Sequence, residues 1–170
     1  VTASTLVSVS SVCGIVGTVF SGLISDKMFR SNRTIPAWLS SLLNLAALAL
    51  FLFGPRQCEI LDIISMILFG ISIGILLCFL GGLMAIDIAP KEATGAAVGV
   101  IGIASYTAAG LQDVVSGFLI ESRKAIVDGN PVYDFSTIRI FWLSAALVSL
   151  LFLLIIWGAR KKHVSSNIHY

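Results

Sequence analysis

Long apolar runs separated by short polar clusters make up most of the chain. Five such runs cover residues 2–25, 37–53, 60–86, 96–120 and 139–159. Each is long enough to cross a hydrocarbon core of about 30 Å as a helix. A helix also satisfies its own backbone polar groups in lipid, as a single open strand cannot. The pattern therefore predicts an all-α membrane protein with five transmembrane helices, followed by a polar tail at 160–170.

Glycines are distributed unevenly among these runs. They recur in 2–25, 60–86 and 96–120, whereas 37–53 has none and 139–159 has one at its end. Small residues let helices approach closely in lipid, while Leu and Phe are sufficient where the neighbour is a lipid tail. The distribution predicts that the three glycine-rich helices are central and that the other two are peripheral.

One face of the 96–120 run combines small and polar residues. Steps of three and four place on it Gly99, Gly102, Tyr106, Gly110, Asp113 and Gly117. Gln112 lies beside this face, and Asp113 is the only charge well inside an apolar run. A carboxylate is costly in lipid and usually marks a pathway or a relay. Two interpretations stay open: tight helix packing around a hydrogen-bonded Asp113, or a substrate cavity lined by Tyr106, Gln112 and Asp113.

Composition and charge support the membrane interpretation and suggest an orientation. The chain is 57% hydrophobic and 12% charged, with a net charge of +2 that is too small and dispersed to suggest nucleic acid. Basic residues concentrate on cytoplasmic loops. By the five-helix count, seven of the eleven Lys and Arg residues share one side: Lys27, Arg30, Arg33, Lys91, Arg160, Lys161 and Lys162. This bias predicts a multi-pass membrane protein with a cytoplasmic C-terminus.

Residues that could support catalysis or metal binding are sparse. Cys13 and Cys78 lie within apolar runs and Cys58 stands alone in a loop, so no paired framework is available. His163 and His169 belong to the polar tail and have no neighbouring ligand residues. Walker, Rossmann and nucleophile-elbow patterns are missing as well. We therefore expect no metal, no cofactor and no enzymatic activity.

The turn between the first two runs reads Gly22-Leu-Ile-Ser-Asp26-Lys27-Met-Phe-Arg30-Ser-Asn-Arg33. Asp26 lies at the C-terminal end of its helix, where the macrodipole disfavours an anion. Its carboxylate would gain from pairing with a base or with the N-terminus of another helix. This predicts a conformational latch formed by Gly22, Asp26, Lys27, Arg30 and Arg33. The alternative is an ordinary charged membrane boundary.

The spacing Gly22-x-x-x-Asp26-Lys27-x-x-Arg30-x-x-Arg33 resembles the loop signature of the major facilitator superfamily, in the variant between the eighth and ninth of twelve helices. The stretch Asp-Ile-Ala-Pro-Lys-Glu-Ala-Thr-Gly-Ala-Ala-Val-Gly at 87–99, followed by Tyr106, is similar to the organophosphate:phosphate antiporters. That branch includes glycerol-3-phosphate and hexose-phosphate transporters and a hexose-phosphate sensor. The resemblance spans essentially the whole chain and implies part of a C-terminal six-helix half. Since the chain starts inside an apolar run, we expect a fragment.

The resemblance implies alternating access, with a phosphorylated small molecule exchanged for inorganic phosphate. Glycerol-3-phosphate or a sugar phosphate is the implied substrate, and the inner (plasma) membrane is the implied location. Partners would be this anion, phosphate, the lipid bilayer and a missing N-terminal half, without nucleic acid. The family's phosphate-gripping arginines come from the first and seventh helices, so the principal binding residues would lie outside this chain.

The chain departs from the antiporters in its third run. Where they carry a Gly-Pro pair in the tenth helix, this chain has Leu76-Leu77 and, further on, Met84. The exact substrate is therefore left open by the sequence. Two alternatives remain: a membrane-bound sugar-phosphate sensor of the same fold, and a major facilitator exporter of unrelated specificity.

Overall fold

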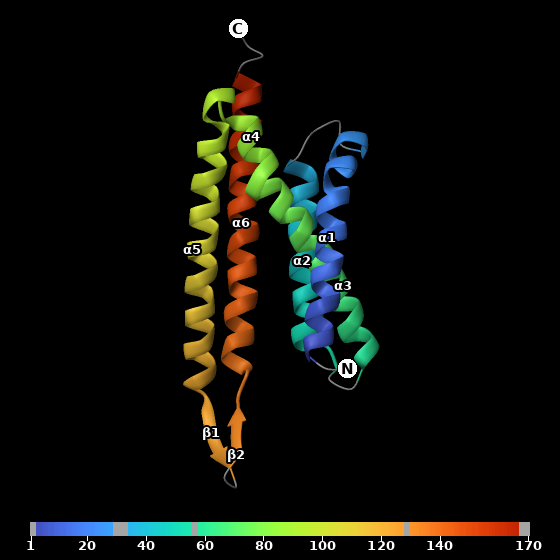
Figure 1. Ribbon diagram of the computed structural model, residues 1–170, viewed down its shortest axis with the longest axis vertical. Helices are drawn as coiled ribbons and strands as arrows, with labels where there is room; N and C mark the ends of the chain where they lie inside the picture. The colour runs from blue at the N-terminus through green and yellow to red at the C-terminus, as the bar shows by residue number, and fades with distance from the viewer. Residues whose placement is uncertain (1–2, 29–33, 56–57, 128–129, 167–170) are drawn as a thin grey trace.

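The computed structural model describes residues 3–28, 34–55, 58–127 and 130–166. Within these ranges the elements are α1 (Ala3–Met28), α2 (Thr34–Phe53), α3 (Glu59–Cys78), the π-helical turn η1 (Phe79–Leu83), α4 (Met84–Ile88), the 3₁₀ turn η2 (Lys91–Ala93), α5 (Thr94–Glu121), β1 (Lys124–Val127), β2 (Asn130–Tyr133) and α6 (Ser136–Ser166). The helices run side by side along the long axis of the molecule (Figure 1).

Each predicted run corresponds to a helical segment long and apolar enough to span a membrane. The five segments are Ala3–Leu23, Thr34–Phe53, Glu59–Asp87, Lys91–Glu121 and Ser136–Ile155. The prediction of an all-α membrane protein with five spanning helices is confirmed. One boundary differs, because α6 continues to Ser166 through residues that the sequence predicts to be a polar tail. Arg and Lys are good helix formers, so loss of apolarity marks the end of the membrane segment rather than the end of the helix.

The two ends of the bundle carry different segments. The last turn of α1, the first turn of α2, α4 and the last turn of α6 lie at one end, while the start of α1 and the β1–β2 hairpin lie at the other (Figure 1). The helix ends next to the Lys- and Arg-rich segments thus lie at the same end of the bundle, as the charge bias predicts. The compartment that each end faces stays a prediction.

The closest packing in the bundle joins α1 to α3. A Cβ atom added at Gly70 would meet the backbone oxygen of Ser10, and one added at Gly74 would meet that of Gly14. The hydroxyl of Thr18 donates across the same contact to the carbonyl oxygen of Gly74, at 3.1 Å. Small residues therefore bring these two backbones together, as predicted for these two helices.

α2 is not peripheral, and that prediction is wrong. In its most apolar window, 28% of the residues are buried, the same share as in the corresponding window of the Glu59–Asp87 segment. The amide nitrogen of Asn44 donates to the hydroxyl of Ser72 on α3 at 3.2 Å. The buried residues of α2 are mostly small, namely Thr34, Pro36, Ala37, Ser40, Ser41 and Ala47. Ala and Ser allow close approach as glycine does, so counting glycines alone missed this face.

α5 is not central within this chain, which corrects the other half of the same prediction. No residue in the most apolar window of its membrane segment, Lys91–Glu121, is buried, and Ser116 is the one buried residue of α5. Cβ atoms added at Gly102 or Gly110 would meet nothing within 4 Å. The predicted small-residue face exists, but no helix of the described residues covers it.

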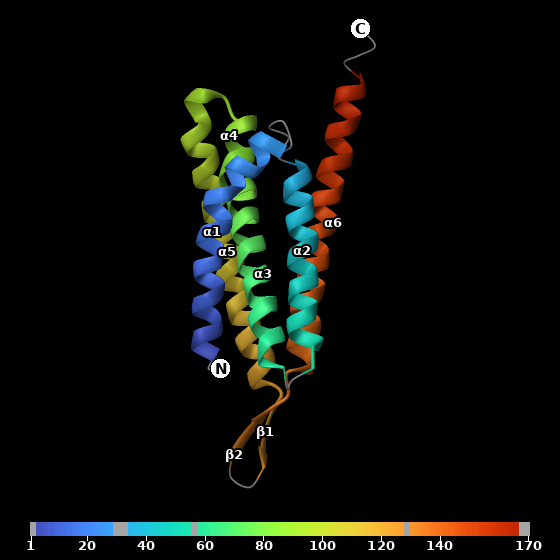
Figure 2. The ribbon, with the colours of Figure 1, turned by 90° about the vertical axis from the view of Figure 1, so that its right-hand side faces the viewer.

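The hairpin between α5 and α6 was not predicted from the sequence. β1 and β2 pair antiparallel, from Lys124 opposite Tyr133 to Val127 opposite Asn130. Outside the ladder, the backbone N–H of Asp134 donates to the carbonyl oxygen of Arg123 at 3.3 Å. The hairpin extends beyond the helix ends in both views (Figures 1 and 2). It therefore joins α5 to α6 outside the spanning segments.

Candidate functional site

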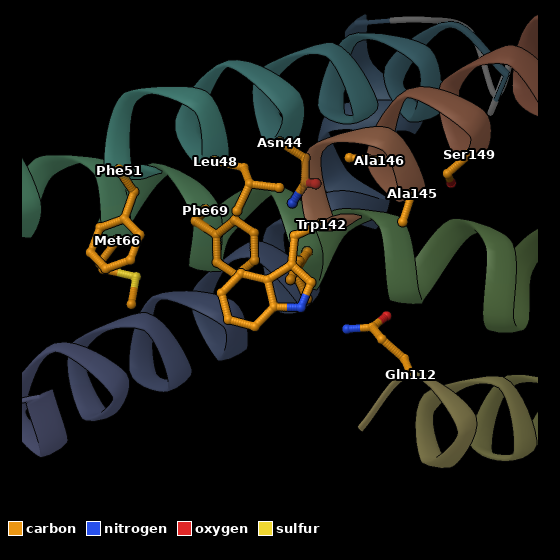
Figure 3. A pocket seen from close by; sticks show the side chains of 11 residues that line it. Asn44, Leu48, Phe51, Met66, Phe69, Gln112, Trp142, Ala145, Ala146 and Ser149 are labelled. Atoms are coloured by element: carbon orange, nitrogen blue, oxygen red, sulfur yellow. The ribbon is translucent and has the colours of Figure 1, made fainter. Parts of the chain in front are cut away.

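A cavity of about 510 Å³ opens between α2, α3, α5 and α6. Figure 3 shows the side chains that line it: Asn44, Leu48, Phe51, Met66, Phe69, Ile73, Gln112, Trp142, Ala145, Ala146 and Ser149. Its volume falls in the range of small-molecule sites, and its walls are largely apolar with a few polar groups. We refer to it as the four-helix cavity.

Two hydrogen bonds fix polar side chains in the walls of the four-helix cavity. Asn44 donates to Ser72 behind it, and the indole N–H of Trp142 donates to the hydroxyl of Ser116 on α5 at 3.0 Å. Ser116 is only 8% exposed, so its bond to Trp142 ties α5 to α6 in a dry position. Gln112 reaches from α5 toward Trp142 across the cavity (Figure 3). The site thus offers an aromatic wall and amide groups.

The four-helix cavity carries no charge of its own. None of the side chains that line it is ionisable. Burying an anion without a compensating charge is strongly unfavourable. By itself the cavity therefore suits a neutral group, and a phosphate inside it would need positive charges from elsewhere.

Of the three residues predicted to line a substrate cavity, the structure places only Gln112 in this one. Tyr106 is 83% exposed, and Asp113 is also exposed on α5. They lie on the uncovered small-residue face, whereas Gln112 and Ser116 point toward α6 and the four-helix cavity. The structure does not bring Tyr106 and Asp113 into the same site as Gln112. Their roles stay predictions.

The sequence is similar to known proteins over most of its length. Residues 2–161 match the family described as PUCC protein. The chain belongs to the PUCC family. A glycerol-3-phosphate transporter of Bacillus subtilis (strain 168) is 30% identical to it over 157 residues, which is 89% of this chain and 32% of that protein. The chain therefore spans about a third of the length of the curated relative it matches.

These matches confirm the coarser part of the resemblance stated from the motifs. A PUCC-family chain with five spanning helices and a transporter as its relative is a multi-pass membrane protein of the major facilitator type. The narrower assignment to the organophosphate:phosphate antiporters stays a prediction.

The predicted latch falls largely on residues that the structure does not describe. Arg30 and Arg33 lie outside the described ranges, as does the side chain of Asp26. A Cβ atom added at Gly22 would meet nothing within 4 Å, and Lys27 is exposed. The latch in this PUCC-family chain therefore stays a prediction.

Sequence reasoning missed the contributions of Asn44 and Trp142. Both lie on helices that the glycine distribution predicts to be peripheral. A usable signal existed for Asn44, because it continues the series Ala37, Ser40, Ser41 at helical spacing and is polar inside an apolar run. Trp142 offered no such signal, since a tryptophan in a membrane helix is equally expected at the lipid interface.

Proposed function

We propose that this chain forms part of an inner-membrane transporter that exchanges a phosphorylated small molecule for inorganic phosphate. The observation that carries the proposal is the 30% identity to a glycerol-3-phosphate transporter over 89% of the chain. The Gly22–Arg33 signature and the 87–99 stretch support the same branch. Glycerol-3-phosphate and sugar phosphates are accordingly the substrates to test first.

The geometry of α5 supports an alternating-access mechanism. Its uncovered face combines glycines with Tyr106 and Asp113, and a charged residue on such a face is costly against lipid. Alternating access requires surfaces that pack in one state and meet water in another. We propose that this face packs on, or lines a pathway with, helices supplied by the rest of the protein.

The charge distribution suggests that this chain and the rest of the protein contribute different interactions with the substrate. Since the four-helix cavity is uncharged, this chain would contribute packing and neutral hydrogen bonds. The positive charges that hold the phosphate would come from outside the chain. The concentration of Lys and Arg in the segments predicted to share a side with the C-terminus supports a cytoplasmic C-terminus.

The uncharged cavity favours a second candidate, a major facilitator exporter of a less polar compound. Apolar walls with Asn44 and Gln112 would bind such a compound without any contribution from other helices.

Transport by the full-length protein in liposomes tests the proposal. We expect labelled glycerol-3-phosphate or hexose phosphate to enter vesicles loaded with inorganic phosphate and not vesicles without it. Binding without uptake would favour a sensor, and uptake of only non-phosphorylated compounds would favour the exporter. Either result would overturn the exchange mechanism.

A variant pair tests the latch within the same assay. Asp26→Asn should impair exchange at unchanged membrane expression, because it removes a charge that only an interhelical contact would reward. Glu121→Gln is the matched control, since Glu121 is exposed and its pair with Lys124 is a surface salt bridge of small energy. Equal exchange by the wild type and Asp26→Asn would overturn the latch.

A further inference from the structure

Two arginines lie where α5 and α6 meet the hairpin. Arg123 lies two residues after the end of the α5 span, and Arg139 belongs to the first turn of the α6 span. The exposed aromatic side chains of Tyr133 and Phe135 accompany them. Aromatic residues and long basic residues are typical of the level of the lipid headgroups. The base of the hairpin therefore lies at the height of one membrane surface.

The two guanidinium groups lie near one carboxylate and leave a net positive charge. Hydrogen bonds from Ser136 are the main cause of the lowered pKa of Asp134, and the positive charges of Arg123 and Arg139 lower it further. The carboxylate oxygens accept the backbone N–H and the hydroxyl of Ser136. Within the described ranges, neither guanidinium group forms a hydrogen bond or an ion pair. Both can therefore still bind an anion.

Arg139 also lies at the rim of the four-helix cavity. It precedes Trp142 and Ala146 by three and seven residues, so it shares the helix face that lines the cavity, one turn nearer to the hairpin. On the facing helices, the cavity extends to Phe51 and Met66, which lie close to the hairpin-side ends of α2 and α3 (Figures 1 and 3). The positive pair thus borders one end of an uncharged, largely apolar cavity.

We propose that Arg123 and Arg139 bind the phosphate of an anionic phospholipid, one acyl chain of which enters the four-helix cavity. Guanidinium groups often pair with phosphate through two parallel hydrogen bonds, and basic pockets between membrane helices bind anionic lipid headgroups. The cavity suits the acyl chain, since most of its walls are apolar and none of the lining side chains is ionisable. A soluble phosphate ester would fit less well, because its hydroxyl groups would face apolar walls.

The lipid site goes beyond the proposed function and does not depend on it. Tyr106 and Asp113, on the uncovered face of α5, take no part in it. The lipid would instead fill the space between α2, α3, α5 and α6, in the leaflet on the hairpin side. Trp142 lines this space, so its fluorescence reports directly whether the space is occupied.

Quenching of Trp142 by brominated lipid tests the site in the full-length protein. Every other tryptophan is replaced by phenylalanine. The protein is then reconstituted in phosphatidylcholine vesicles with increasing fractions of phosphatidylglycerol that is brominated in its acyl chains. We expect saturable quenching at low fractions of this anionic lipid. Brominated phosphatidylcholine should quench only in proportion to its amount.

Two pairs of variants separate the site from general effects. Arg139→Gln should raise the half-saturating fraction of phosphatidylglycerol about fivefold, which corresponds to about 1 kcal/mol for one basic residue at a membrane surface. Lys124→Gln is its matched control, because the Lys124 ammonium is already paired with Glu121 at 2.9 Å. Ala146→Phe should abolish saturable quenching by filling the cavity. Leu147→Phe should not, since Leu147 is exposed and does not line the cavity.

Equal quenching by the two brominated lipids, or equal shifts in Arg139→Gln and Lys124→Gln, would overturn the lipid site. Saturable quenching that persists in Ala146→Phe would overturn it as well, because the acyl chain would then lie elsewhere. Displacement of brominated phosphatidylglycerol by aqueous glycerol-3-phosphate would assign the arginine pair to a soluble phosphate ester instead. None of these measurements involves transport, so failure of the lipid site would leave the proposed function standing.

Discussion

The contact between α1 and α3 allows one substitution to be worked through from the coordinates. In Gly74→Ala, the new methyl group would meet the carbonyl oxygen of Gly14 and would lie 2.9 Å from its carbonyl carbon and 3.0 Å from the nitrogen of Thr18. All three atoms belong to the backbone, so no side chain can rotate away and the helices must separate. Such overpacking costs about 1–3 kcal/mol.

Separation of the helices would also weaken the hydrogen bond from Thr18 to the carbonyl of Gly74, now 3.1 Å long. Interhelical bonds of this kind contribute about 0.6 kcal/mol. Ala favours a helix over Gly by about 1 kcal/mol, which offsets part of these losses, so we expect Gly74→Ala to lower the free energy of unfolding by roughly 1–3 kcal/mol. Steric trapping or reversible denaturant unfolding of the full-length protein in micelles would measure the difference.

Gly95→Ala is the control for this measurement. The position is exposed and a Cβ there meets nothing within 4 Å, so the stability should stay the same or rise slightly, because Ala favours a helix over Gly. Equal stability of Gly74→Ala and the wild type would refute the close α1–α3 approach.

Three further predictions concern α5 and α6. Ser116→Ala removes the acceptor of the Trp142 indole N–H and should destabilise the α5–α6 contact by about 1 kcal/mol, measured in the same unfolding assay; an unchanged stability would contradict the bond. Hydrogen bonds from the backbone N–H and the hydroxyl of Ser136 hold the pKa of Asp134 below its ordinary value of 3.8. The charged carboxylate therefore stabilises the start of α6 fully at pH values above 3.8, and this stabilisation is lost as the pH falls through the lowered pKa. Asp134→Ala should therefore speed amide exchange at Ser136 and its neighbours at neutral pH, with the difference from the wild type vanishing in strong acid; a difference that persists there would be inconsistent with the charged turn. Asp113→Asn should shift the pH dependence or the substrate preference of uptake if Asp113 lines the pathway, and unchanged profiles would assign it to packing.

Secondary structure could be predicted from the sequence because apolarity and length alone decide which segments span lipid. The order and number of spans follow from that, as the segments from Ala3–Leu23 to Ser136–Ile155 show. Helix neighbours could not be predicted in the same way. Small residues indicate that a face packs, as at Gly70 and Gly74, but they do not say whether its partner lies in the same chain, as α5 demonstrates.

The candidate site was predictable only where a polar residue stood out in an apolar run. Gln112 met that condition, and the structure places it in the four-helix cavity. Trp142 did not, because its role comes from the position of Ser116 on another helix. The π turn was also outside the reach of the sequence, since Gly81-Gly82 is compatible with a plain α-helix.

The β1–β2 hairpin determines how α5 can move relative to α6. Cross-strand pairing from Lys124–Tyr133 to Val127–Asn130 keeps the two helix ends at a fixed spacing on that side. Any displacement of α5 must then be a pivot about this end, with the helix as a lever arm. For 28 residues the arm is about 42 Å long, so a tilt of about 5° moves the far end by about 4 Å. The largest excursion therefore falls at the start of α5, beside α4, while the hairpin end stays nearly still.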